Sequence, residues 1–560
     1  MDFQTGKLYE GFKLIEQNEI KEINSLAMIF KHIKSGAQLL YIKNDDDNKV
    51  FSVTFRTPPT DSTGLPHILE HSVLCGSRKF PTKDPFVELA KGSLNTFLNA
   101  MTFSDKTMYP IASVNDADFY NLMNVYLDAV FYPNIYNKPQ ILAQEGWHYE
   151  LDKPDEEIIY KGVVYNEMKG VFSSPEQVLF RKVQESLFPD TTYRYDSGGD
   201  PDVIPELTQK QFLDFHKKYY HPSNSYLYLY GNGNILQHLK LINEDYLNNF
   251  KQMEVDSKIE FQLPYTEPKN VIVEYPISTD ESEEDKTFLS LNFVVGQSTD
   301  AELYMAFDIL TYLLLHTSAS PLKRALLEAG LGEDVYGSFD RSILQPVLSI
   351  VVKNTNSQEK NKFEEIVFNT LQQLVDEGID KKLIEAAINI YEFKLKESDY
   401  GRYPKGLIYS MSCMDSWLYD ENPLIHLSYE NTLDKVKKAL TSDYFEKLID
   451  KYLLNNQHRS LLIVEPKRGL AQKKDQDIRN ELADYKESLT DGELDRLIEE
   501  TKKLKKYQEE ANNPEELKMI PLISLEDIDK KPKSIPLIEK KEGEVSVLFC
   551  PIATNDIAYV

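Results

Sequence analysis

The chain has 560 residues, 41% of them hydrophobic, and a formal net charge of -27. This length is too great for one hydrophobic core and predicts about three domains, while the hydrophobic content argues against global disorder. The acidity argues against nucleic acid as a partner, because phosphate would be repelled. It would favour cationic substrates, although surplus acid more often just keeps a surface soluble.

The cysteines and the N-terminal residues bear on the compartment. Cys75, Cys413 and Cys550 lie far apart and form no C-x-x-C pair, so neither a disulfide framework nor a thiolate metal site is indicated. Residues 1–25 are acidic without an apolar core, unlike a secretory signal or an Arg-rich transit peptide. No run of about 18 apolar residues occurs. We therefore expect a cytoplasmic protein without a membrane partner.

The first predicted elements are two strands and a short helix. Residues 37–44 and 49–57 alternate in polarity around the acidic turn at 45–47, which is typical of a β-hairpin. Pro66 suits a first helical turn and Gly76 suits a helix stop. A short helix is expected between them.

This helix carries the most informative residues of the chain, His67, Glu70 and His71. Helical positions i and i+4 share one face, so both imidazoles could bind one metal ion. The pattern H-x-x-E-H is the inverzincin signature of zinc peptidases. Zinc would lower the pKa of its water to about 7, and Glu70 could take the water's proton and pass it to the leaving amine. The alternative is two ordinary surface histidines on one helix.

Strands and long helices come after the motif. Residues 92–103 and 107–113 are predicted to form two strands joined by a turn, and helical patterns cover 114–131 and 161–188. Ser174 is expected to restart the second helix after a break, as a helix cap.

The first of these strands has a possible function of its own. If it lies at the edge of a sheet near the metal, Asn99, Ala100 and Met101 could pair with the main chain of an extended peptide. The alternative is an ordinary internal strand, and the residues alone do not decide between the two.

A catalytic zinc requires a third protein ligand and an open position for water. Glu167 lies in a largely apolar helical stretch, where a lone carboxylate needs a partner. Glu145 is the competitor, although it could instead accept a hydrogen bond from a ligand histidine. The residues alone leave this choice open.

The second segment, about residues 270–465, comes after a connector rich in proline and charge and repeats the order of the first. Residues 287–315 give a strand, a polar loop and a helix, as residues 49–74 do. The second copy has no His or Glu pair at the position of the motif. We interpret this as duplication of one α+β module that carries a single metal site.

We therefore predict an α+β fold with two tandem homologous modules, each a sheet packed by helices, followed by a helical hairpin linker. The predicted divisions are a zinc-bearing catalytic module at 1–255, a metal-free module at 256–467, the charged hairpin linker at 468–545 and the start of a truncated third module at 546–560. About fifteen residues cannot form a domain alone, so we expect the chain to be a fragment that lacks a further half.

Several segments together resemble the pitrilysin/insulinase clan of zinc peptidases, most closely its presequence protease and falcilysin branch. These segments are residues 67–89, 92–113, 145–150, 161–170, 197–208 and 221–232. The resemblance covers residues from about 10 to the C-terminus and is most specific within 50–235.

The resemblance implies one zinc ion held by His67, His71 and Glu167, with Glu70 as the catalytic base. It also favours the sheet edge for Asn99 to Met101. Leu74 and Phe86 resemble apolar pocket residues of the family, although composition alone would place both in the core.

The family encloses unstructured oligopeptides between two halves, so the implied partners are such peptides and a missing C-terminal half. Two alternatives stay open: a non-catalytic scaffold of the same fold, and an inactive zinc-binding fragment that lacks its other half.

Overall fold

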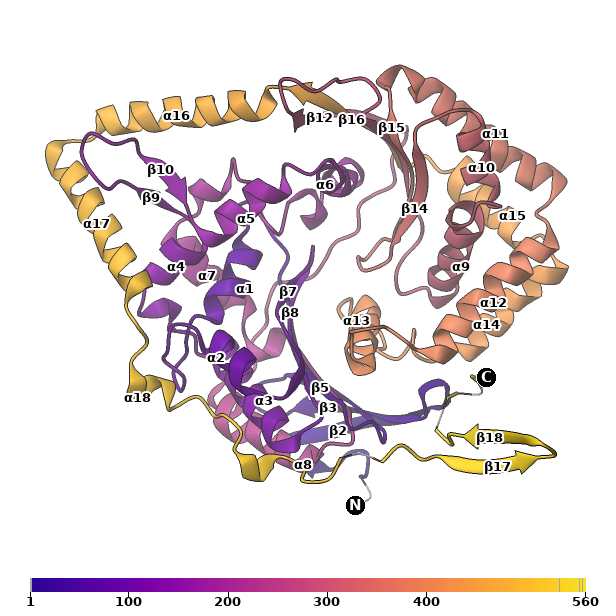
Figure 1. Cartoon of the computed structure of the whole chain (residues 1–560), viewed down its shortest axis with the longest axis horizontal. Helices are drawn as coiled ribbons and strands as arrows, with labels where there is room; N and C mark the ends of the chain where they lie inside the picture. The colour runs from indigo at the N-terminus through magenta and orange to yellow at the C-terminus, as the bar shows by residue number, and fades with distance from the viewer. Residues whose placement is uncertain (1–2, 533, 553, 556, 560) are drawn as a thin grey trace.

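The computed structural model describes residues 3–532, 534–552, 554–555 and 557–559. These residues form two large sheets, each covered by helices, and a strap of helices along the outside (Figure 1). The predicted α+β class is confirmed. Within the described residues, no helix is both long enough and apolar enough to cross a membrane.

The first sheet has nine strands in the order β1-β2-β3-β4-β11-β5-β8-β6, with β7 also paired to β8. They are β1 (Leu8–Tyr9), β2 (Phe12–Ile20), β3 (Ser25–His32), β4 (Gln38–Lys43), β5 (Lys49–Arg56), β6 (Asn95–Leu98), β7 (Met101–Thr102), β8 (Lys106–Ser113) and β11 (Ser225–Gly231).

The predicted hairpin of β4 and β5 is wrong, because β11 lies between them. β11 is parallel to β4 and antiparallel to β5, and it is buried along its whole length. The loop at residues 44–48 is long enough to cross the roughly 10 Å that one intervening strand requires. A buried strand needs pairing on both edges, and β11 obtains it here.

The second sheet has five strands in the order β12-β16-β13-β15-β14. They are β12 (Lys269–Ile277), β13 (Thr287–Val294), β14 (Asp334–Asp340), β15 (Val347–Thr355) and β16 (Arg459–Arg468).

The two sheets share one topology. In each copy the last strand, β11 or β16, lies between the first two, parallel to β4 or β12 and antiparallel to β5 or β13. The next strand outward, β8 or β15, carries the edge strands β6 and β7 or β14. This common order confirms two homologous modules. The division of the chain at residues 255, 467 and 545 stays a prediction.

The helices of the first module lie mostly on one face of its sheet, where the largest core cluster forms. They are α1 (Leu65–Val73), α2 (Pro85–Gly92), α3 (Asp116–Phe131), α4 (Gln140–Glu145), α5 (Val163–Val171), α6 (Pro175–Leu187), α7 (Gln209–Tyr219) and α8 (Ile235–Leu241). A two-stranded sheet, β9 (His148–Glu150) and β10 (Ile159–Lys161), projects beside them. As predicted, Ser174 caps α6 after a break.

The helices of the second segment are α9 (Ala301–Thr311), α10 (Pro321–Glu328), α11 (Lys360–Glu377), α12 (Lys381–Glu397), α13 (Lys405–Trp417), α14 (Glu430–Lys437) and α15 (Tyr444–Ile449). Most of them cover one face of the second sheet.

Each module sends one helix onto the other module's sheet. α6 packs on β12, β13 and β16 through apolar residues such as Val183 and Leu187. α13 packs on β5 and β11 through residues such as Leu407 and Trp417. Each sheet is therefore buried on its second face by a helix from the other copy.

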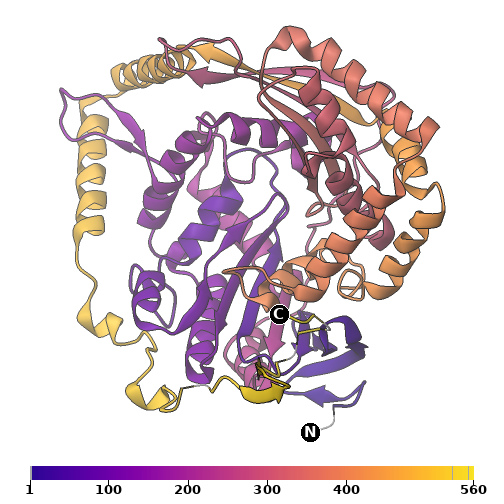
Figure 2. The same ribbon diagram turned by 45° about the vertical axis from the view of Figure 1, so that its right-hand side comes forward.

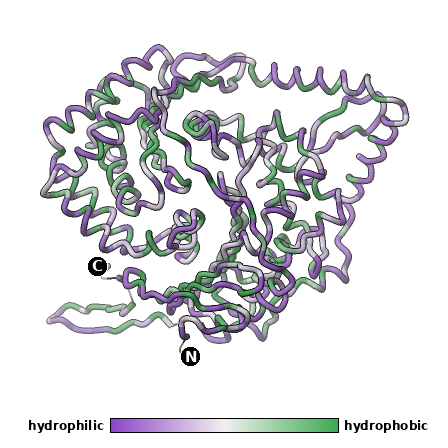
Figure 3. Tube along the Cα trace, turned by 180° about the vertical axis from the view of Figure 1, so that it is seen from behind, coloured by the Kyte–Doolittle hydropathy of each residue, from purple (hydrophilic) through white to green (hydrophobic). Residues whose placement is uncertain are grey.

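The predicted pair of charged helices is present as α16 (Leu470–Ser488) and α17 (Asp491–Glu509). The pair does not close into an antiparallel hairpin, because the helices lie along two successive edges of the molecule (Figures 1 and 2). Their backbone trace is mostly hydrophilic (Figure 3). Their few apolar residues, such as Leu482 and Ile498, pack on β9 and β10, where Tyr149 stacks on Tyr485. This contact with the first module holds the pair open.

After α17 come α18 (Pro514–Leu517) and a two-stranded sheet of β17 (Ile538–Glu542) and β18 (Val545–Phe549). The prediction of strands in the last residues is met by β18. Residues 553, 556 and 560 lie outside the described part of the chain.

Candidate metal centre

The helix α1 begins where two backbone segments almost touch. Gly64 precedes α1 with a φ of 70°, and a Cβ there would lie 2.7 Å from the carbonyl oxygen of Gly198. A side chain at Gly64 would be strained in both respects. The start of α1 is therefore set against the loop that contains Gly198.

His67 and His71 lie one turn apart on α1. Their ring centroids are 4.9 Å apart, as the spacing predicts. Glu167 of α5 joins them, with Oε2 at 3.8 Å from Nε2 of His67 and 3.9 Å from Nε2 of His71. One ligand atom from each residue lies within 4.8 Å of the other two. Two imidazole nitrogens and one carboxylate oxygen are a donor set that suits zinc and leaves room for a fourth ligand.

The remaining ring nitrogens are directed away from this point. His67 Nδ1 lies 3.0 Å from the carbonyl oxygen of Gly198 and His71 Nδ1 lies 3.3 Å from Oε2 of Glu145. Both partners accept a hydrogen bond, so each Nδ1 carries the proton and each Nε2 presents its lone pair to Glu167. Glu145 thus lies behind His71, in the position of the hydrogen-bond partner that the sequence left open.

The environment of Glu145 favours charge on the His71–Glu145 pair. Burial alone would raise the pKa of Glu145, but hydrogen bonds from His71 and Gln144 outweigh it and lower this pKa. Burial would likewise lower the pKa of His71, and Glu145, with the nearby charges of Glu70 and Glu167, raises it instead. A metal ion at Nε2 would therefore compete with a proton on His71.

Cys75 lies beside this pair and is buried, with Sγ 3.5 Å from Oε1 of Glu145. Burial raises the pKa of its thiol. Cys75 therefore packs as a neutral thiol.

Glu70 is oriented by a residue that the sequence analysis missed. The hydroxyl of Thr102, on β7, donates a hydrogen bond of 2.6 Å to Oε2 of Glu70. Thr102 comes directly after the candidate edge residues Asn99 to Met101, and this adjacency was the available signal.

A cavity of about 1090 Å³ opens over the four motif residues. Asn99, Ala100 and Met101 line it, and β6 and β7 form the edge of their sheet. Leu74 and Phe86 lie elsewhere, half-buried against the core of the first module, and neither lines the cavity. Their role in an apolar pocket stays a prediction.

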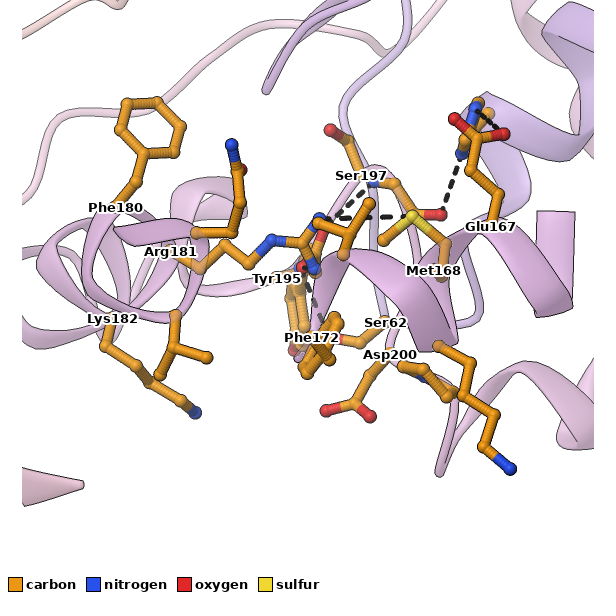
Figure 4. Close-up of a pocket in the computed structure, with 18 of the residues that line it drawn as sticks. Ser62, Glu167, Met168, Phe172, Phe180, Arg181, Lys182, Tyr195, Ser197 and Asp200 are labelled. Carbon is orange, nitrogen blue, oxygen red and sulfur yellow. Dashed lines mark hydrogen bonds and ion pairs between the residues drawn. The ribbon is translucent and has the colours of Figure 1, made fainter. Parts of the chain in front are cut away.

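The walls of the cavity come from segments far apart in the chain. α6 and the loop after it contribute residues such as Phe180, Arg181 and Tyr195 (Figure 4). The opposite side contains residues of β12 and of α16, such as Val273 and Lys474. Sequence analysis did not find these residues, because only the folded chain brings them together.

Known protein families and relatives match this chain along its length. The family description "Peptidase M16 inactive domain" matches residues 206–391, and a second description, of a region associated with M16 peptidases, matches residues 464–560. "Protein HypA" of Clostridium perfringens is 51% identical over 560 residues, covering 100% of this chain and 58% of that protein. "Presequence protease 1, chloroplastic/mitochondrial" of Arabidopsis thaliana is 43% identical over 557 residues, covering 98% of this chain and 52% of that protein.

The chain belongs to the pitrilysin-type M16 peptidase family. Solved M16 structures share its fold: pitrilysin has a TM-score of 0.58 at 18% identity over 82% of this chain and 47% of its own. A Helicobacter pylori protease has a TM-score of 0.57 at 15% identity over 80% of this chain and 99% of its own. The chain spans about half the length of the curated M16 relatives named above.

The match to an M16 inactive domain concerns a particular part of the chain. Residues 206–391 contain most strands of the second sheet. His67, Glu70, His71 and Glu167 all lie outside that range. The inactive-domain match therefore describes the metal-free copy.

Proposed function

We propose that this chain is the metal-bearing part of a zinc-dependent endopeptidase that cleaves unstructured oligopeptides. The supporting observation is the convergence of His67, His71 and Glu167 beside Glu70, on a large cavity. Membership of a peptidase family agrees with this proposal.

The ion would be held by Nε2 of His67, Nε2 of His71 and the carboxylate of Glu167. When bound, zinc lowers the pKa of a coordinated water to about 7 and polarises a peptide carbonyl. Gly198 and Glu145 each accept the Nδ1–H of one histidine, which holds both rings in the orientation that binding requires.

Glu70 would act as the general base and then as the general acid. Its carboxylate lines the cavity beside the histidines and would take the proton of the attacking water, then deliver it to the amine that leaves. The hydroxyl of Thr102 fixes the orientation of this carboxylate.

The substrate would lie along the edge of the first sheet. Backbone groups of residues 99–101 would pair with an extended peptide, which selects for unfolded segments more than for sequence. The Arabidopsis thaliana relative is named a presequence protease, and this name suggests targeting peptides as one class of substrate.

We further propose that turnover needs a second segment like the other half of the curated relatives, of which this chain matches 52–58%. A cytoplasmic location also stays a proposal. It is supported by three free cysteines, Cys75, Cys413 and Cys550, which suit a reducing compartment.

The test is metal analysis combined with peptide cleavage by the chain mixed with the remaining part of the Clostridium perfringens relative. We expect one zinc per chain and cleavage that Glu70→Gln reduces by about 10²–10⁴-fold while zinc is kept. Unchanged cleavage by this variant would exclude Glu70 as the base.

The same mixture separates the alternatives. Cleavage by the chain alone, as fast as by the mixture, would exclude the need for a second half. Zinc binding without cleavage in either sample would favour a non-catalytic scaffold.

A further inference from the structure

The carbonyl oxygen that orients His67 belongs to a loop ordered by a single carboxylate. Oδ1 of Asp196 accepts hydrogen bonds from the backbone N–H groups of Gly198, at 2.9 Å, and Gly199, at 3.3 Å. The backbone N–H of Asp196 in turn donates to the hydroxyl of Ser62 at 3.2 Å. Asp196 therefore sets the position of the Gly198 carbonyl that accepts the Nδ1–H of His67.

Arg181, on α6, holds Asp196 in place. Its Nη1 forms an ion pair with Oδ2 of Asp196. Both side chains are mostly buried, with 19% and 15% of their surfaces exposed. The guanidinium is thus neutralised from within the protein, which makes it a poor site for a carboxylate of the substrate.

The same guanidinium also contacts the helix that carries Glu167. Its Nη2 lies 3.9 Å from Sδ of Met168, and its Cζ lies 4.4 Å above the ring of Phe172 (Figure 4). Met168 is the next residue after Glu167. One side chain therefore supports the segments that carry two of the three candidate ligands.

The support for Arg181 comes from the metal-free module. α6 lies on the second sheet through Val178, Leu179, Val183 and Leu187. Arg181 projects from α6 toward the first module, where it meets Asp196. The helix thus connects the second sheet to the loop of the metal centre.

We propose that Arg181 and Asp196 are positioning residues for the metal centre: they fix the Gly198 carbonyl, and through it the ring of His67. This inference rests on the proposed zinc function. Loss of an outer hydrogen-bond partner typically weakens metal binding by 10–100-fold, and here the partner is a backbone carbonyl, so only the residues that order its loop can be varied.

The test measures zinc affinity by competition with a chromophoric zinc chelator, using the whole chain at pH 7.5. We expect Asp196→Ala and Arg181→Met to weaken zinc binding by about 10–100-fold. Asp196→Asn keeps an acceptor for the N–H groups of Gly198 and Gly199, so its loss should be smaller than that of Asp196→Ala. Lys182→Met, at the next position of α6, is the matched control and should bind zinc as the parent does.

Two further measurements separate positioning from general destabilisation. The visible absorption spectrum of the Co²⁺-loaded chain reports ligand geometry, and it should change in Arg181→Met and stay unchanged in Lys182→Met. The melting temperature of each metal-free variant shows whether it folds. If Asp196→Ala does not fold, Asp196→Asn and Arg181→Met decide the result.

Equal zinc affinities and Co²⁺ spectra for the parent, Arg181→Met and the folded Asp196 variants would overturn the inference. An equal loss in Lys182→Met would overturn it as well, because the effect would not be specific. A parent chain that binds no zinc would instead defeat the proposed function, and this outcome is visible before any variant is compared.

Discussion

The two modules have one strand topology and differ in the helix that comes after their second strand. In the first, α1 turns His67, Glu70 and His71 toward a cavity and buries its other face. In the second, α9 is buried over most of its length, and its Asp308 pairs with Arg341. The comparison teaches that the core of each copy is complete without a metal, because apolar packing supplies the fold. The chemistry is added by a few side chains on one helix face.

The exchanged helices show a second difference. α6 lies on the second sheet and directs Arg181 toward the metal centre. α13 lies on the first sheet and directs Asp415 to the hydroxyl of Tyr304, 2.7 Å away, in the interior of the protein. The same exchange therefore supports a metal centre in one direction and a buried polar contact in the other.

The largest expected effect comes from removing a candidate ligand. We expect His71→Ala to weaken zinc binding by more than about 100-fold, beyond the loss caused by an outer partner. The melting temperature of the metal-free chain should change little, because the fold does not depend on this ring. His316→Ala, in the second module, is the control. Metal analysis and thermal melting check both variants, and zinc retained by His71→Ala would contradict the assignment.

The next effect concerns Glu145 and pH. The pKa of His71 is raised above its usual 6.5 because, although burial opposes it, Glu145 accepts its hydrogen bond. Protons therefore compete with zinc as the pH falls through this raised pKa. In Glu145→Gln the pKa of His71 should fall, so acid release of zinc moves to lower pH, while zinc affinity at pH 8 drops by about 10–100-fold. Zinc competition titrations from pH 5.5 to pH 8 measure both; an unchanged release midpoint would refute the coupling.

A smaller effect is expected at Thr102. Thr102→Val removes the hydroxyl that donates to Glu70 and keeps the shape of the side chain. A hydrogen bond to a charged group contributes about 1.5 kcal/mol, so kcat should fall about 10-fold with zinc affinity unchanged. Cleavage assays on the chain mixed with a second half check this. Thr96→Val, on the same sheet edge, should have no effect, and an equal loss there would assign the effect to the strand.

The smallest effect lies in the second module. Burial raises the pKa of Asp415 to about 6, so between about pH 4 and pH 6 the unfolded state loses this proton first. Stability contributed by Asp415 therefore falls as the pH rises through this window. Asp415→Asn should be more stable relative to the parent at pH 7 than at pH 4, by about 1 kcal/mol, since the amide keeps part of the hydrogen bonding.

Urea denaturation at the two pH values measures this difference. The exposed Asp376→Asn, in the same module, is the matched control. The same stability difference at both pH values in Asp415→Asn would contradict the role of the buried carboxyl.

The sequence by itself determined the local features of this protein. The spacing of His67 and His71 places both on one helix face, Ser174 caps α6, and the repeated order of strand, loop and helix indicates two copies. Each of these depends on residues close in the chain, where helix periodicity and capping act directly. The resemblance to a peptidase family added Glu167, which spacing alone left equal to Glu145.

Only the tertiary structure decided the rest. It placed β11 between β4 and β5, exchanged α6 and α13 between the sheets, opened the α16–α17 pair along the first module, and set Arg181 and Asp196 behind His67. These arrangements join segments far apart in the chain. They are selected by which distant apolar faces become buried together and which buried polar groups find partners, and a pattern read along the chain contains neither.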